Sequence, residues 1–149
     1  AARRMALQSR ADILAALAAG IVLIALLAAI YLVVFPALHW DETQQLQKLL
    51  VVPFWLRFIA VLRAAVSEEI LFRGYAIERV QELTGSRVAA GVFTWAIFTV
   101  EHVSYWGWHH LLVAGAGGAV LTLLYLWRRN LWGNMLAHFM VDAAGFLAG

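Results

Sequence analysis

The sequence contains no cysteine, and only 13% of its 149 residues are charged. Without cysteine the chain has no thiol nucleophile, no disulfide framework and no metal site built on thiolates. A soluble domain of this size would expose far more charge, whereas 64% of these residues are hydrophobic and the mean hydropathy is +0.79. The composition therefore predicts an integral membrane protein in which residues 1–149 form a single transmembrane domain.

The few charged residues indicate how the chain is oriented in the membrane. A net charge of +2 does not indicate a nucleic-acid-binding protein, and basic residues beside apolar segments instead mark cytoplasmic ends. We therefore expect the N-terminus and two later loops in the cytoplasm, and residues 106–110 outside. The basic residues that define these ends are Arg3, Arg4 and Arg10, then Arg79 and Arg87, then Arg128 and Arg129.

Five apolar segments alternate with these ends and cover residues 13–38, about 49–82, 88–106, 111–127 and 131–147. The first is long enough to cross a bilayer with some tilt, and Asp12 suits the N-terminus of a helix. Residues 43–48 form a polar connection. We expect an all-α, polytopic transmembrane helix bundle with about five spans.

Two short patterns have ordinary explanations. The glycine-rich residues 114–119 follow no strand and precede no Lys-Ser/Thr pair, so they do not form a phosphate loop. Small residues four apart instead allow transmembrane helices to approach closely. His109 and His110 are interpreted as a solvated pair in a turn rather than as metal ligands.

Residues 67–75 place ionisable groups inside an apolar segment, where such groups are costly and mark functional sites. Glu69 and Arg73 are one helical turn apart and can form an ion pair. Glu68 lies about 100° round the helix from Glu69 and has no obvious local partner. We therefore expect Glu68 to be the chemically active carboxylate.

Helix geometry predicts that further polar groups reach a similar depth. Glu68 lies roughly 24 Å along its helix from the break at residue 84, and His102 roughly 22 Å from Arg87. His138 and Asp142 lie roughly 12 and 18 Å from Asn130, on the same helix face as Asn134. Polar residues also join transmembrane helices without any chemistry, but two carboxylates and two histidines at similar depth favour one site.

Three short motifs resemble those of the CPBP family of membrane proteins, which includes the CAAX proteases, the bacteriocin-processing proteins and the Abi and Rce1-type proteins. They are Glu68-Glu69-x-x-x-Arg73, Phe98-x-x-x-His102 and His138-x-x-x-Asp142. Each lies on its own apolar segment, and together they define a family-like catalytic core over residues 64–146.

This resemblance implies an intramembrane endopeptidase of the glutamic type that needs no cofactor. Glu68 matches the catalytic glutamate, and His102 matches its partner in activating water. His138 and the residue four positions later match the pair that stabilises the oxyanion. Eukaryotic Rce1-type members have Asn at that last position, whereas this chain has Asp142, which as an ionised side chain cannot donate a hydrogen bond. Asp142 could instead hold His138 as an imidazolium or fix its tautomer.

The resemblance also predicts partners and location. We expect a peptide or protein substrate, lipidated or membrane-embedded, and an integral protein of a prokaryotic inner or plasma membrane. The sequence leaves the substrate open among prenylated C-terminal tails, bacteriocin leaders and sorting tails.

Other functions stay open. Glu68, His102 and His138 make a His₂Glu set like that of some zinc hydrolases, although no HExxH motif is present. A catalytically idle scaffold or immunity-type protein is another alternative, and a proton-coupled transporter is a third, without apparent inverted repeats. Among proteases, no nucleophile-elbow serine is present, and Asp142 is the only Asp deep in a segment, so a two-Asp site lacks its second carboxylate.

Overall fold

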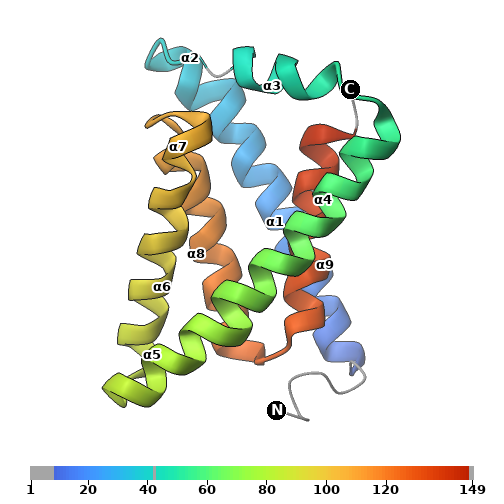
Figure 1. Cartoon of the computed structure of the whole chain (residues 1–149). Helices are drawn as coiled ribbons and strands as arrows, with labels where there is room; N and C mark the ends of the chain where they lie inside the picture. Colours follow the sequence, from blue (N-terminus) through green and yellow to red (C-terminus); the bar gives the residue numbers. More distant parts are fainter. Residues whose placement is uncertain (1–8, 42, 148–149) are drawn as a thin grey trace.

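Every regular element in the computed structural model, which describes residues 9–41 and 43–147, is a helix (Figure 1). The elements are α1 (Arg10–Ala29), η2 (Ile30–Val34), α2 (Phe35–Ala37), α3 (Thr43–Leu50), α4 (Phe54–Glu68), η3 (Glu69–Ala76), α5 (Ile77–Thr84), α6 (Arg87–Glu101), α7 (Val103–Trp106), α8 (His110–Arg128) and α9 (Leu131–Phe146). The segments η2 and η3 are π-helical. The expected all-α class is confirmed.

Side-chain caps fix where the long helices begin. Ser9 and Asp12 form a capping box at the start of α1, as the position of Asp12 predicted. Ser86 accepts a hydrogen bond from the Ala89 N–H at the start of α6, and Asn130 accepts one from the Gly133 N–H at the start of α9. These caps satisfy backbone donors that have no partner within the helix.

Within the described residues, two helices are long and apolar enough to cross a membrane, namely residues Arg10–Ala37 and His110–Arg128. The other expected segments also form helices. The continuous helix α4–η3–α5 carries many charges, and α6 and α9 have 15 and 16 residues. The number of five spans therefore stays a prediction.

The basic ends of the helices gather at one end of the bundle. In Figure 1 the start of α1, the turn between α5 and α6, and the turn between α8 and α9 all lie at the bottom, while α3, α7 and the end of α9 lie at the top. This arrangement agrees with the alternation of loops expected from the sequence.

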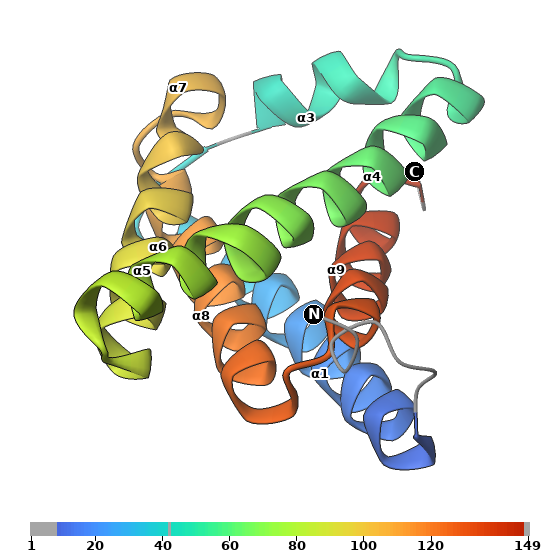
Figure 2. The ribbon, with the colours of Figure 1, turned by 60° about the horizontal axis from the view of Figure 1, so that its bottom comes forward.

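The polar connection expected at residues 43–48 lies largely within α3, which runs across the top of the bundle (Figures 1 and 2). Leu46, Leu49 and Leu50 are spaced so that one face of this short helix is apolar. The sequence reading missed this helix because polar residues dominate the segment.

Helix α9 lies between α1 and α4 and contacts both of them (Figure 2). The small residues of α8 allow it to approach α6 closely, as expected, because a Cβ on Gly118 would lie 2.8 Å from the Phe98 ring. The apolar core that joins α1, α8 and α9 is built on Leu23, Leu121, Leu124 and Ala137.

Candidate active site

The polar residues singled out in the sequence come from three helices. Glu68 is the last residue of α4 and Glu69 the first of η3, while His102 follows the end of α6. His138 and Asp142 lie one turn apart on α9. The three motifs are therefore presented by neighbouring parts of the bundle.

The helix that carries Glu68 and Glu69 widens at this point. Residues Glu69–Ala76 are π-helical and lie between two α-helical stretches of one continuous helix. Such segments are uncommon and occur frequently at functional sites, because the extra residue changes the direction in which side chains point.

Glu69 is completely buried and accepts hydrogen bonds from three side chains. Arg73 Nη1 lies 2.8 Å from Oε1, His138 Nδ1 lies 2.9 Å from the same oxygen, and Asn134 Nδ2 lies 3.1 Å from Oε2. The ion pair expected between Glu69 and Arg73 is confirmed. A buried carboxylate is tolerated when it is paired and hydrogen-bonded in this way.

Arg73 extends this network to α8. Its Nη2 donates to the Gly118 carbonyl at 3.2 Å, and its guanidinium lies 4.5 Å from the centre of the Phe98 ring. We call Glu69, Arg73, Asn134 and His138 the buried network. It joins η3, α8 and α9 through residues that are 0–6% exposed.

Phe98 packs between the polar groups. Its ring centre lies 4.6 Å from that of His102, 5.1 Å from that of Phe72 and 6.5 Å from that of His138. The Phe98 ring thus lies between His102 and Arg73 as an apolar surface. It also contacts the rings of His102 and His138 and helps to hold them in place.

His102 has a defined tautomer. Its Nδ1 lies 2.7 Å from the Phe98 carbonyl oxygen, which can only accept a hydrogen bond, so Nδ1 carries the proton. In the neutral ring Nε2 is then the acceptor.

The interpretation of His109 and His110 as a solvated pair is wrong for His110. His110 is 7% exposed, begins α8, and stacks on Trp106 with ring centres 4.8 Å apart. Its ring also lies parallel to that of His102 at 6.0 Å. His109 stacks on Trp40 at 4.5 Å. Aromatic partners supplied by the fold, invisible in the local sequence, cover both rings.

Glu68 has surroundings unlike those of Glu69. Its side chain is 27% exposed, and its Oε2 lies 3.9 Å from His138 Nε2, beyond hydrogen-bond distance. The same Nε2 lies 3.5 Å from Asp142 Oδ2. In the part of the chain that the structure describes, no direct hydrogen bond joins Glu68 to His102. We call Glu68, His102 and Asp142 the open group.

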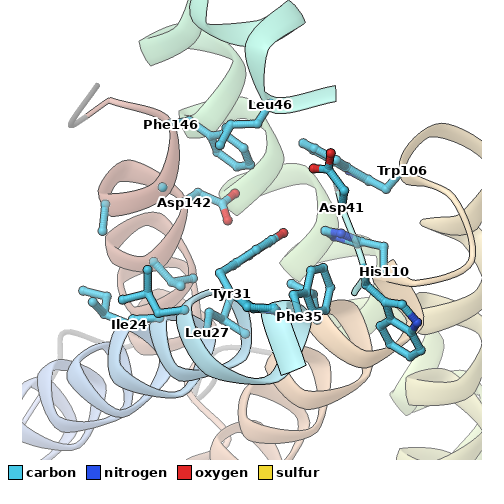
Figure 3. A pocket seen from close by; sticks show the side chains of 18 residues that line it. Ile24, Leu27, Tyr31, Phe35, Asp41, Leu46, Trp106, His110, Asp142 and Phe146 are labelled. Atoms are coloured by element: carbon cyan, nitrogen blue, oxygen red, sulfur yellow. The ribbon is translucent and has the colours of Figure 1, made fainter. Parts of the chain in front are cut away.

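A cavity of about 540 Å³ reaches this site, a size usual for ligand pockets. Its lining is apolar except at a few positions, and Asp142 is the residue that it shares with the open group. In Figure 3 the Asp142 carboxylate points into the cavity from α9. The cavity therefore reaches Asp142, which lies beside His138 Nε2, while Glu68, His102 and His138 do not line it.

The alternative of a zinc site receives no geometric support from the described residues, in which no group of three or more His, Asp or Glu side chains is arranged to hold a metal ion. His138 Nδ1 donates to Glu69, which leaves Nε2 as the ring nitrogen that could bind a metal. The expectation that no cofactor is needed stays a prediction.

Sequence reasoning missed two relationships. It placed Asn134 on the correct face of α9 but not in contact with Glu69, and it paired Glu69 with Arg73 alone. The structure adds the bonds from Asn134 and His138 to Glu69. The only signal was the one-turn spacing of polar residues on α9, which names a face without naming its partner.

Comparison with known proteins agrees with this geometry. A family model described as Rce1-like, type II CAAX prenyl endopeptidase, matches residues 50–144, a stretch that contains all three motifs. Searches of curated proteins and of solved structures gave no match. Proteins of the matched family are membrane-embedded CAAX-type proteases, which act on peptide or protein substrates. On the strength of a match over more than half its length, this chain belongs to the Rce1-like family of CAAX-type intramembrane proteases.

Proposed function

We propose that the chain is a glutamic-type endopeptidase in which Glu68 and His102 activate water, with residues 64–146 as its catalytic core. The contrast between the two adjacent carboxylates supports this assignment. Glu69 has three donors, including a cation, whereas Glu68 has no hydrogen-bond partner among the described residues and its side chain is 27% exposed. A general base must be able to take a proton from water, and Glu68 has that freedom.

The proposed reaction begins with water held between Glu68 and the acceptor Nε2 of His102. Glu68 takes a proton while the water oxygen bonds to the carbonyl carbon of the substrate. When the carbon–nitrogen bond breaks, Glu68 returns the proton to the leaving amine, so the products are a carboxylic acid and an amine, which then ionise to a carboxylate and an ammonium group. His102 orients the water and stabilises the charge that develops on it.

His138 is the proposed donor to the oxyanion. Its Nδ1 already donates to Glu69, so only Nε2 can face the substrate, and it must carry a second proton to donate. Nearby Asp142, at 3.5 Å, supplies a negative charge that accompanies this imidazolium. Asp142 therefore acts through His138, which resolves how an Asp can occupy a position where a hydrogen-bond donor was expected.

The substrate is proposed to be a peptide or protein segment that enters from the bilayer or its surface and carries a lipid or a membrane anchor. The name of the family adds prenylated C-terminal tails as the first class to test. Cells that express wild-type protein or Glu68→Gln are compared by proteomics of C-terminal fragments, with Glu82→Gln, an exposed carboxylate, as the matched control. Fragments present with wild type and Glu82→Gln but absent with Glu68→Gln support the proposal. Equal fragments with all three proteins would remove it.

We also propose that the N-terminus and the Arg-rich end of the bundle face the cytoplasm, because basic residues concentrate at that end. The absence of native cysteine allows single cysteines to be placed at Ser86 and at Trp108. An impermeant thiol reagent added to intact cells should label the cysteine at position 108 and not the one at position 86. Strong labelling at position 86 would reverse the orientation.

A further inference from the structure

The cavity beside Asp142 is built largely by residues that the family model does not cover. Of its eighteen lining residues, ten precede residue 50, where the family match begins. They come from α1, η2, α2 and the segment up to α3, and include Ile24, Leu27, Tyr31 and Phe35. The first helix therefore supplies most of one wall of the cavity.

Tyr31 is placed in this wall by a local change of helix. Residues Ile30–Val34 are π-helical, and the Phe35 N–H donates to the Ile30 carbonyl, five residues back. Pro36, which has no N–H, follows directly. Figure 3 shows the Tyr31 side chain extending from this helix into the cavity, and its ring packs edge-to-face on Phe35 at 5.1 Å. The other π-helical segment of the described residues carries Glu69.

The polar groups of the cavity indicate the kind of occupant. Asp142 lies at one side, and Asp41 and His110 lie at the other, near Trp106 (Figure 3). A lipid chain alone would take the Asp142 carboxylate, whose side chain is 22% exposed, out of water without offering a donor, which is costly. A peptide segment offers main-chain N–H groups to this carboxylate and apolar side chains to the wall.

We propose that this cavity holds the peptide segment beside the scissile bond, and that Tyr31 sets the size of the substrate side chain it accepts. The proposal rests on the proposed function, since it assumes that hydrolysis occurs beside Asp142 and His138. It assigns a specificity-determining role to a helix that lies outside the family match.

The test uses quenched fluorescent peptides of one length that carry an S-farnesylated cysteine and, beside it, Ala, Val, Phe or Trp. We expect Tyr31→Ala to lower KM for the Trp peptide by about tenfold or more, with kcat little changed, because pocket contacts discriminate size by at least this factor. Tyr31→Phe keeps the ring and should retain the wild-type order. Val33→Ala is the matched control, since Val33 lies on the same helix, is 64% exposed and does not line the cavity.

An unchanged order of KM values in folded Tyr31→Ala would overturn the proposal. So would an effect confined to exchange of the farnesyl group for geranylgeranyl, because a lipid would then fill the cavity. Binding of the same peptides to Glu68→Gln, measured by fluorescence anisotropy, separates the two proposals. Size-dependent binding that follows Tyr31 without any cleavage by wild type would remove only the proposed hydrolysis.

A second measurement uses the wild-type chain and does not depend on how a variant folds. The varied position of the peptide is replaced by benzoylphenylalanine, and the cross-linked residues are identified by mass spectrometry. We expect cross-links within residues 24–40. Cross-links found only within residues 50–144 would show that the first helix does not contact this position and would overturn the proposal.

Discussion

Glu68 and Glu69 are adjacent in the chain, yet Glu69 belongs to the buried network and Glu68 to the open group. Glu69 is enclosed by Arg73, Asn134 and His138, whereas the Glu68 side chain is 27% exposed and its Oε2 lies 3.9 Å from His138 Nε2. A carboxylate whose acceptor sites are filled orients its neighbours, and one with vacant acceptor sites is able to exchange protons. The difference arises from helix geometry, since a step of about 100° turns one side chain inward and leaves the other at the edge.

His138 connects the two regions. It donates to the buried network through Nδ1 and presents Nε2 to the open group. The hydrogen bond from Nδ1 to Glu69 therefore fixes the orientation of the ring, and Nε2 is the nitrogen that faces the open group. In the proposed mechanism, the buried network therefore contributes to catalysis by orienting His138, without contact between Glu69 and the substrate.

Removing the open group should have the largest effect. Glu68→Gln keeps the shape of the side chain but removes its ability to accept a proton, and His102→Ala removes its partner. Each should lower turnover by about 10²–10⁴-fold. Because the two residues act as a unit, the double variant should be scarcely slower than either single variant. Cleavage of a quenched lipidated peptide in detergent measures this, with folding checked by thermal melting. Wild-type turnover in folded Glu68→Gln would favour the scaffold alternative.

Breaking the buried network should affect both stability and turnover. If Glu69 paired with Arg73 alone, Glu69→Gln would be expected mainly to lower thermal stability. Loss of one partner from a buried pair costs about 3–5 kcal/mol, so that loss should still appear. The bond to His138 adds the expectation of slower turnover at temperatures where the variant remains folded. Full turnover per folded molecule would show that Glu69 does not orient His138.

The structure shows why only part of this could be read from the sequence. One-turn spacings within a helix predicted the pair of Glu69 with Arg73 and the shared face of Asn134, His138 and Asp142. The bonds between helices depend on how each helix is rotated about its axis, which the periodicity of α9 alone does not give. The motif resemblance brought the three segments together but could not assign a partner to each nitrogen of His138.

The first helix was the least predictable part of the site. Its sequence from residue 13 to 38 is almost uniformly apolar, so no face stands out, and the resemblance began after it. Nothing in that pattern indicated a π-helical turn or the inward position of Tyr31. Likewise, α3 was hidden because its polar residues outnumber the leucines that form its apolar face.

Asp142 belongs to the open group, but we propose that it acts only through His138. If it acts by accompanying the charge on His138, Asp142→Asn should retain substantial activity and shift the dependence of turnover on pH. Asp142→Leu removes the polar group altogether and should cost considerably more. The measurement is a pH–rate profile for each variant. Equal losses in Asn and Leu variants, with no change in the profile, would indicate that the carboxylate itself contacts the reacting atoms.

The smallest expected effect is that of removing metal. In a zinc hydrolase, Glu68, His102 and His138 would act together as ligands, and the separation between the two regions would disappear. Among the described residues, however, no group of three or more His, Asp or Glu side chains is arranged to hold a metal ion. We therefore expect purified protein to contain less than stoichiometric zinc and to keep its turnover in strong chelator. One zinc per chain, with activity lost on chelation and restored by zinc, would replace the glutamic mechanism. Glu68, His102 and His138 would then be ligands of a single metal site.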